Sequence, residues 1–171
     1  LACFKIRAVP INVNYRYVAE ELQYLLLDSN AAACVIHSRF APLLADIRSA
    51  LPNLRVILQV PDATNNALLE GAVWYEDALS QSSTDKPSAG YHGDDLYILY
   101  TGGTTGMPKG VLCRNADAVV ECFGGSKTSR TIEEFVAEAT GNFRALPSPP
   151  FMHGAGHWIA MRTWLTGGTI T

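Results

Sequence analysis

Short apolar segments alternate with amphipathic segments through residues 1–60, and this alternation constrains the fold more than any other feature of the chain. Residues 31–37 and 54–60 are rich in aliphatic side chains and have the length of buried strands, and Val9–Val13 reads as a shorter one. Residues 18–27 and 42–50 have the apolar spacing of amphipathic helices. Because strands that alternate with helices form parallel sheets, we predict an α/β fold with a mostly parallel sheet flanked by helices.

Three helices are predicted in the last third of the chain. Asn115 is the expected cap of the first helix. Thr131 and Glu134 have the spacing of a capping box, which starts the second. The third helix follows Gly156, and Gly167 suits its C-terminus.

Residues 96–111 contain the most distinctive motif, LYILYTGGTTGMPKGV. Its first part, residues 96–100, has the composition of a buried strand, which we expect to be the next strand of the same sheet. Glycines and threonines follow, and Lys109 is the only charged residue between Asp95 and Arg114. Glycines let backbone N–H groups approach a ligand, hydroxyl groups add donors, and the lysine supplies a positive charge. This chemistry predicts a loop that binds a polyphosphate.

Two other interpretations of this motif fit less well. A simple hairpin turn needs one or two glycines, not four arranged around threonines and a lysine. The P-loop of ordinary NTPases needs Gly-Lys followed directly by Ser or Thr. Here Met107 and Pro108 separate Gly106 from Lys109, and Gly110 follows the lysine, so the NTPase fingerprint is not met.

The segment from Tyr100 to Val111 resembles the phosphate-binding signature of the adenylate-forming enzymes, which include acyl-CoA synthetases, luciferases and the adenylation domains of peptide synthetases. The common form of that signature is Tyr-Thr-Ser-Gly-Thr-Thr-Gly-x-Pro-Lys-Gly-Val, and this chain departs from it only at Gly102, where serine is usual. One hydroxyl is lost and every backbone donor remains, so we expect phosphate binding to persist. The resemblance implies that these residues contact the ATP phosphates: Thr101, Gly102, Gly103, Thr104, Thr105, Gly106 and Lys109.

Two further segments resemble the same family. Residues 21–29 match a scaffold helix, to which we assign no chemistry. Residues 150–153 match the family's Pro-Leu-Phe-His segment, which implies that His153 and Gly154 border the acyl and adenylate pocket. A histidine between apolar residues is also often a hydrogen-bonded core residue, so both roles stay open for His153.

The resemblance implies the large N-terminal domain of an AMP-forming acyl-CoA synthetase, which is an acid–thiol ligase. Such an enzyme uses ATP and Mg²⁺ to convert a carboxylic acid, here expected to be fatty or otherwise hydrophobic, into an acyl adenylate that coenzyme A then attacks. In relatives the adenine contacts, an acidic metal ligand and a catalytic lysine follow the point at which this chain ends. We therefore expect residues 1–171 to be one partial domain, truncated at both ends and lacking the C-terminal domain. We assign no catalytic residue within it, and expect weak polyphosphate binding without turnover.

A noncatalytic remnant of the same fold, which binds nucleotide or a protein partner, stays open as an alternative. Beyond Thr171, a Tyr-Gly-x-Thr-Glu-like segment and a late lysine would indicate an enzyme, whereas a stop codon would indicate the remnant. A phosphotransfer enzyme would need an acidic metal-binding strand, which the sequence does not display.

Composition argues against several other classes of protein. The net charge of −3 offers no basic surface for nucleic acid. No apolar run approaches the roughly 18 residues of a transmembrane helix, although peripheral membrane contact stays open. The chain has four cysteines without a C-x-x-C pair, so we expect reduced thiols in a cytoplasmic protein and no disulfide framework. The sequence does not indicate an oligomeric state.

Overall fold

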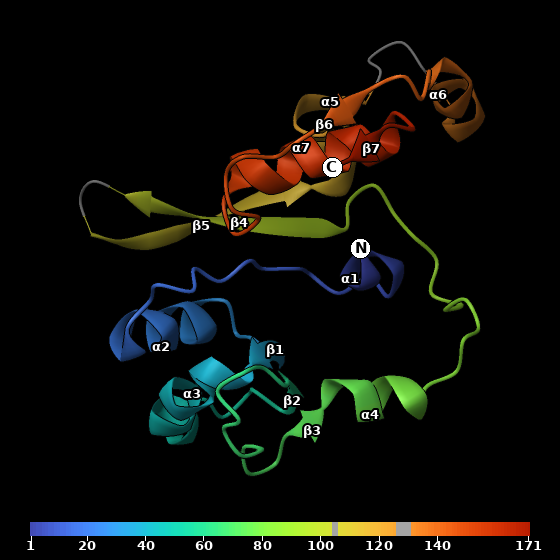
Figure 1. Ribbon diagram of the computed structural model, residues 1–171. Coiled ribbons are helices and arrows are strands. Elements are labelled where there is room, and N and C mark those ends of the chain that lie inside the picture. The colour runs from blue at the N-terminus through green and yellow to red at the C-terminus, as the bar shows by residue number, and fades with distance from the viewer. Residues whose placement is uncertain (104–105, 126–130) are drawn as a thin grey trace. The chain divides into compact units, whose positions relative to one another are not determined.

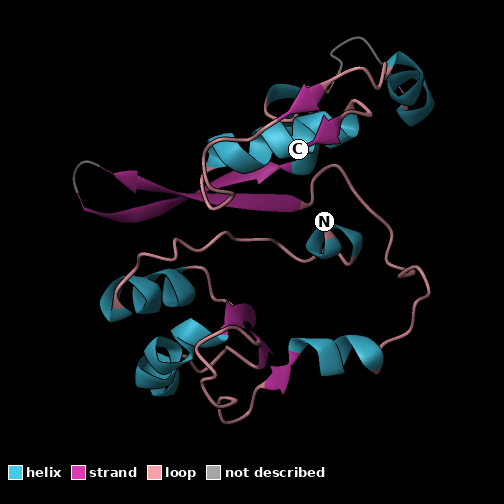
Figure 2. Ribbon diagram, in the orientation of Figure 1, coloured by secondary structure: helices cyan, strands magenta, loops and turns pink. Residues whose placement is uncertain are grey.

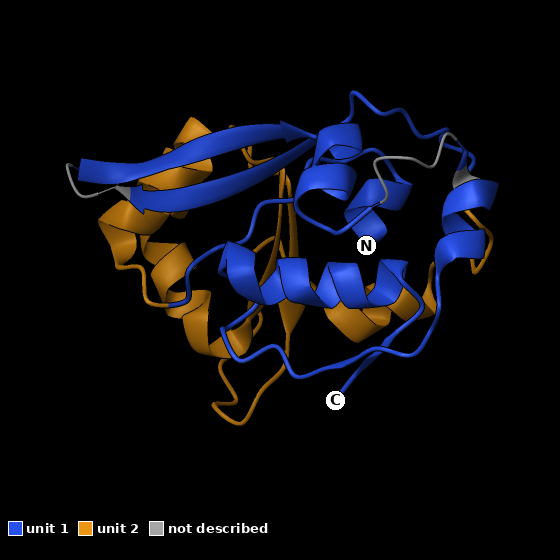
Figure 3. Ribbon diagram, turned by 90° about the horizontal axis from the view of Figure 1, so that it is seen from above, with its two compact units in different colours: residues 1–15, 87–171 blue, residues 16–86 orange. Residues whose placement is uncertain are grey.

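The computed structural model describes residues 1–103, 106–125 and 131–171. The chain forms two compact units, which Figure 3 distinguishes by colour. Unit 1 comprises Leu1–Tyr15 and Pro87–Thr171, and unit 2 comprises Arg16–Lys86. Figure 1 labels their helices and strands, and Figure 2 colours them by type. Both units combine helices with β-structure, so the predicted α/β class is confirmed.

Unit 2 contains a parallel sheet of three strands in the order β1 (Ala33–His37), β2 (Val56–Val60) and β3 (Val73–Trp74). Its helices are α2 (Ala19–Asp28), α3 (Ala41–Ile47) and α4 (Tyr75–Ser80), and the short 3-10 helices η1 (Ser38–Phe40) and η2 (Arg48–Ala50) flank α3. The strands and helices predicted between residues 18 and 60 are confirmed, with boundaries that shift by a few residues.

Leucine and isoleucine side chains fill the core of unit 2. Helix α2 buries Leu22, Leu25 and Leu26, a stripe at the spacing of one helical face. Helix α3 contacts α2 and buries Leu44 and Ile47. Removal of this apolar surface from water is the main favourable contribution to the stability of the unit.

One amide side chain is also fully buried in unit 2. Gln59 on β2 donates from Nε2 to Ser38 Oγ and to Ala67 O, both at 3.0 Å. Its Oε1 accepts from Leu69 N at 2.9 Å. Because its polar atoms are paired, the burial of this amide carries little penalty, and the bonds tie the loop after β2 to the sheet.

Substitution of Leu25 by alanine should destabilise the chain by about 2–5 kcal/mol, because it leaves a cavity where a fully buried side chain stood. Leu27 on the same helix is 46% exposed and provides the matched control. The Leu27→Ala variant should change the free energy of unfolding by less than about 1 kcal/mol. Urea unfolding followed by circular dichroism measures both, and equal losses would contradict the assignment of the core.

Unit 1 contains α1 (Ala2–Lys5), β4 (Leu96–Gly103), β5 (Gly106–Arg114), α5 (Asn115–Glu121), α6 (Ile132–Glu138), β6 (Arg144–Ala145), α7 (Gly154–Leu165) and β7 (Thr169–Ile170). Strands β4 and β5 pair antiparallel, and β6 pairs with β7 in parallel. Tyr97, Ala118 and Phe123 form the centre of the core. Partly buried side chains from α1, β4, β5, α5 and α7 pack around them, so this core joins the hairpin to the helices that follow it.

Two predictions for β-structure in unit 1 are wrong. Strand β4 is not the next strand of the parallel sheet, because it pairs with β5 in a separate two-stranded sheet. Val9–Val13 forms no strand and contributes a single bridge, from Ile11 to Ile98. Proline in this segment has no N–H to donate to a ladder, which explains why pairing stops at one bridge.

The helix-end predictions are confirmed in two places and wrong in one. Thr131 Oγ1 accepts from Glu134 N at 3.1 Å, and the Glu134 carboxylate accepts from Thr131 N at 3.1 Å, which completes the predicted capping box. Gly167 ends α7 with a φ of 74°, a conformation that glycine adopts without strain. Asn115 is the first helical residue of α5, and Arg114 occupies the N-cap position without a side-chain capping hydrogen bond.

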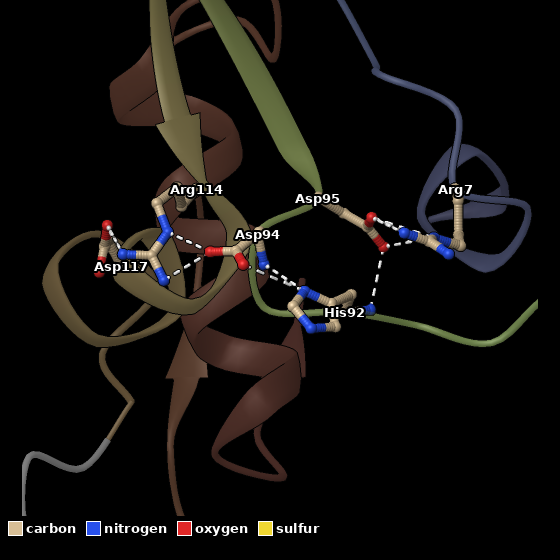
Figure 4. Close-up of polar contacts among 6 residues, drawn as sticks. All are labelled: Arg7, His92, Asp94, Asp95, Arg114 and Asp117. Atoms are coloured by element: carbon tan, nitrogen blue, oxygen red, sulfur yellow. Dashed lines mark hydrogen bonds and ion pairs between the residues drawn. The ribbon is translucent and has the colours of Figure 1, made fainter.

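Charged side chains close the open end of the β4–β5 hairpin (Figure 4). Asp95, which directly precedes β4, accepts from Nη2 of Arg7 at 2.7 Å and from Nε at 3.0 Å. Asp94 accepts from Nε of Arg114, the last residue of β5, at 2.7 Å. Arg114 also lies 3.6 Å from the carboxylate of Asp117 on α5. These contacts connect both strands to the segments that flank them.

Substitution of Asp95 by asparagine should lower stability at neutral pH, because it removes the ion pair with Arg7. The hydrogen bonds from Arg7, aided by the backbone N–H of His92, lower the pKa of Asp95 below its usual 3.8. A carboxyl with a lowered pKa contributes stability that is complete above its unfolded pKa and is lost as pH falls through its folded pKa. The difference between wild type and Asp95→Asn should therefore be constant near neutral pH and shrink below about pH 4.

Urea unfolding across this pH range measures that difference. The Asp46→Asn variant removes the same charge from an exposed position on α3 and serves as the control. A difference between wild type and Asp95→Asn that persists undiminished at about pH 2 would show that the ion pair does not contribute as described.

Candidate functional site

The antiparallel pairing of β4 and β5 brings two of the predicted phosphate ligands together. Thr101 lies directly opposite Lys109. Side chains at opposed positions of a two-stranded sheet project from the same face, so the hydroxyl and the ammonium group are neighbours. Both residues are exposed, and no described residue forms an ion pair with Lys109. The pair is therefore accessible to an anionic ligand.

The predicted loop lies at the tip of a β-hairpin, although a hairpin turn was the interpretation that fitted the motif less well. Gly103 pairs with Gly106, and the register shifts between Thr101 and Gly103. The predicted ligands Thr104 and Thr105 lie outside the described residues. The hairpin is compatible with ligand binding because Gly102, Gly106 and Met107, which lie near its tip, are exposed.

The glycines of the hairpin serve different purposes. A Cβ atom added at Gly102 or Gly106 would meet no atom within 4 Å, so the backbone there borders open space. Gly106 also has a φ of 150°, which side chains other than hydrogen disfavour. At Gly110 a Cβ would approach Tyr100 Cζ to 3.1 Å, so this glycine makes room for an aromatic ring.

The second predicted segment forms the turn that starts α7. His153 is the N-cap residue and is exposed, and Gly154 is the first residue of the helix. A Cβ at Gly154 would lie 2.9 Å from Leu99 Cδ2. The turn thus contacts β4 at a position close in sequence to Thr101, where the predicted phosphate loop begins.

A second histidine, His157 on α7, has polar partners that sequence analysis did not foresee. Its Nδ1 lies 3.1 Å from Phe151 O and 3.1 Å from Asn12 Nδ2, and its Nε2 makes a short contact with the Tyr97 hydroxyl. Trp158 Nε1 donates to the same hydroxyl at 3.1 Å. The signal in the sequence was a histidine beside a tryptophan on a helix that is otherwise largely apolar.

Burial keeps the central groups of this network neutral. It raises the pKa of Tyr97 to about 12, although the hydrogen bond from Trp158 acts in the opposite direction. Burial also lowers the pKa of His157, with the carbonyl groups of Phe151 and His153 opposing that effect. At neutral pH the contacts are therefore hydrogen bonds between uncharged side chains.

Unit 1 also contains two largely apolar cavities. One has a volume of about 610 Å³ and is lined by residues of α1, α5 and α7, among them Phe4, Val119 and Met161. The other has a volume of about 380 Å³ and reaches Asn12 and His157. No helix in the described part of the chain is both long enough and apolar enough to cross a bilayer.

Comparison with known proteins identifies the family. The family described as AMP-binding enzyme matches residues 1–171. This chain belongs to the AMP-binding enzyme family. A medium-chain acyl-CoA ligase, Mig, from Mycobacterium avium is 47% identical over 177 residues, which cover 99% of this chain and 32% of the relative. A 3-oxocholest-4-en-26-oate–CoA ligase from Rhodococcus rhodochrous is 38% identical with the same coverage. The chain thus spans about a third of the length of these relatives.

Solved structures support the same AMP-binding fold. ATP-bound MatB from Rhodopseudomonas palustris superimposes with a TM-score of 0.70 at 21% identity, over 95% of this chain and 29% of MatB. A red-emitting luciferase from Phrixothrix hirtus gives a TM-score of 0.72 at 17% identity, over 99% of this chain and 32% of the luciferase. At these identities the likeness concerns the fold.

Substitution of Gly156 by alanine should disrupt the turn before α7. A Cβ there would lie 2.4 Å from Pro149 O and 2.6 Å from Pro150 O, and these are backbone atoms that cannot rotate away. We expect a loss of about 1–3 kcal/mol in the free energy of unfolding. Gly102→Ala is the control, since the added methyl group meets open space. Equal unfolding midpoints in urea for the two variants would contradict the close packing of this turn.

Proposed function

We propose that this chain carries the phosphate-binding part of an AMP-forming acyl-CoA synthetase. The observation that supports this most is the exposed pair of Thr101 and Lys109, opposed on the hairpin of a chain that the AMP-binding family matches along its whole length. In this proposal the pair, with Gly102, Gly103 and Gly106 and the loop between them, holds the β- and γ-phosphates of ATP.

The proposed reaction has two steps. A carboxylate oxygen of the acid attacks the α-phosphorus of ATP, the bond to the β-phosphate breaks, and pyrophosphate leaves with the electron pair. The thiolate of coenzyme A then attacks the acyl carbon, and AMP leaves. The contribution of this chain to the first step is to position the triphosphate and to stabilise negative charge that moves onto pyrophosphate, through Lys109 and the hydroxyl of Thr101.

The proposed acid is fatty or otherwise hydrophobic. The relative at 47% identity is named a medium-chain acyl-CoA ligase, and the one at 38% acts by its name on a sterol-derived acid. The first name denotes an acyl chain and the second a steroid skeleton, and both are largely apolar. We further propose that His153 and Gly154, at the start of α7, border the acyl and adenylate part of the site, because this turn contacts the strand that carries Thr101.

Magnesium and cellular location complete the proposal. We propose that Mg²⁺ accompanies ATP. Among the described residues no group of three or more His, Cys, Asp or Glu side chains is arranged to hold a metal ion. We place the protein in the cytoplasm, where ATP and coenzyme A are both present. All four cysteines are free, which fits a reducing compartment.

Substitution of Lys109 by glutamine should weaken the binding of ATP and of inorganic pyrophosphate by about tenfold, because a charge-assisted hydrogen bond to phosphate is lost. Lys86→Gln removes one positive charge from an exposed residue of unit 2 and should leave both affinities unchanged. Titrations followed by NMR tolerate the weak binding that we expect of this chain.

The same samples test turnover. We expect no carboxylate-dependent exchange of pyrophosphate into ATP by residues 1–171, and robust exchange would show that the chain holds a complete site. Equal affinities in the Lys109→Gln variant and wild type would contradict the proposed phosphate contact. Binding of nucleotide by a longer polypeptide that cannot activate any carboxylic acid would favour the noncatalytic alternative.

A further inference from the structure

We propose that His157 is a positioning residue for the site described above. In this inference His157 holds residues 151–153 in a fixed position relative to β4, and with them the start of α7. The inference rests on the proposed function, because the groups that it positions are the acyl side of the site, His153 and Gly154, and the phosphate ligands at the end of β4.

Either neutral tautomer gives the imidazole ring a hydrogen bond on each side. With the proton on Nδ1, His157 donates to Phe151 O, 3.1 Å away; with Nδ1 unprotonated, it accepts from Asn12 Nδ2, also at 3.1 Å. On the other side of the ring, Nε2 accepts from the Tyr97 hydroxyl in the first tautomer and donates to it in the second, and the hydroxyl oxygen also accepts from Trp158 Nε1. In both tautomers hydrogen bonds connect the Trp158 indole to the Phe151 carbonyl, either directly from His157 or through Asn12.

Phe151 O is the point at which these hydrogen bonds reach the turn. The same carbonyl accepts from Asn12 Nδ2 at 2.9 Å, so groups that are distant in sequence hold one backbone atom. Within the turn, His153 N donates to Pro150 O at 3.0 Å. Rotation of this carbonyl would break the bond from Asn12 and the contact with His157, and this restricts the backbone that leads into His153.

Tyr97 connects His157 to strand β4. It is 4% exposed, and its ring packs edge-on against Phe123 and against His157, with centroid distances of 5.9 and 5.6 Å. Strand β4 continues from Tyr97 to Thr101, which opposes Lys109. His157 therefore links the turn to the same strand that leads to the phosphate ligands.

A purely structural role and a positioning role predict different results. If His157 only stabilised the fold, its loss would lower the apparent affinity for every ligand, in proportion to the loss of folded protein. If His157 positions the turn, its loss should leave unchanged the affinity for a ligand that contacts the hairpin alone. It should lower the affinity for a ligand that also contacts His153 and Gly154. Inorganic pyrophosphate is the first kind of probe, and an octanoyl adenylate analogue with a sulfamate in place of the phosphate is the second.

Two substitutions separate the aromatic contact of the His157 ring from the hydrogen bonds of its nitrogens. His157→Phe keeps the aromatic contact with Tyr97 and removes both nitrogens, whereas His157→Asn retains an N–H near the position of Nδ1. With NMR titrations of the 171-residue chain, we expect His157→Phe to bind pyrophosphate within about twofold of wild type and the acyl adenylate analogue about tenfold more weakly. His157→Asn should retain most of the wild-type affinity for the acyl adenylate analogue.

The outcomes distinguish the inference from the proposed function. Equal binding of both probes by wild type and His157→Phe, or an equal loss of both, overturns the inference alone. A wild-type chain that binds neither probe overturns the proposed function and, with it, this inference. Should His157→Phe fail to fold, Tyr97→Phe removes only the hydroxyl. This variant should likewise bind pyrophosphate as wild type does and bind the acyl adenylate analogue more weakly. Nitrogen NMR of wild type then supplies the second measurement, and the absence of a hydrogen bond to either ring nitrogen of His157 would overturn the inference.

Discussion

The register of the β4–β5 hairpin is the constraint on which the proposed site depends. Because side chains alternate between the faces of a strand, a slip of one residue would move Lys109 to the face opposite Thr101. Packing of the Tyr100 ring over Gly110 and the ion pair of Asp94 with Arg114 at the open end both favour the observed pairing. Neither contact involves the predicted phosphate ligands, so the hairpin can be aligned without a ligand.

The distribution of charge around the hairpin favours an anion near its tip. Arg7 and Arg114 lie at the open end and are paired with aspartates. Lys109 lies nearer the tip and forms no ion pair within the described ranges. A cation whose charge is not already neutralised gives a ligand phosphate more favourable electrostatic energy than one engaged with a carboxylate. Around the hairpin, Arg7 and Arg114 are therefore engaged in structural ion pairs, whereas Lys109 is accessible.

The core beneath the hairpin combines apolar packing with a small polar network. Tyr97, His157 and Trp158 place polar atoms in surroundings where an unpaired group would be costly, and each of those atoms has a partner. Apolar contacts alone would tolerate small shifts of α7 on β4. Directed hydrogen bonds define its position more narrowly, and the proposed site, which combines a hairpin and a helix start, would require this.

The sequence by itself determined the features that depend on near neighbours in the chain. The amphipathic spacing of α2, the capping box at Thr131 and the helix end at Gly167 involve residues within a few positions of one another, so their patterns are readable. The composition of the Gly/Thr stretch is likewise local, and it predicts a polyphosphate site. The tertiary structure alone decided that β4 turns back onto β5, and that Tyr97 meets His157 across 60 positions of sequence. Periodicity reports which face of an element is buried and carries no information about which distant element covers it, because that choice is made by the packing of the whole unit.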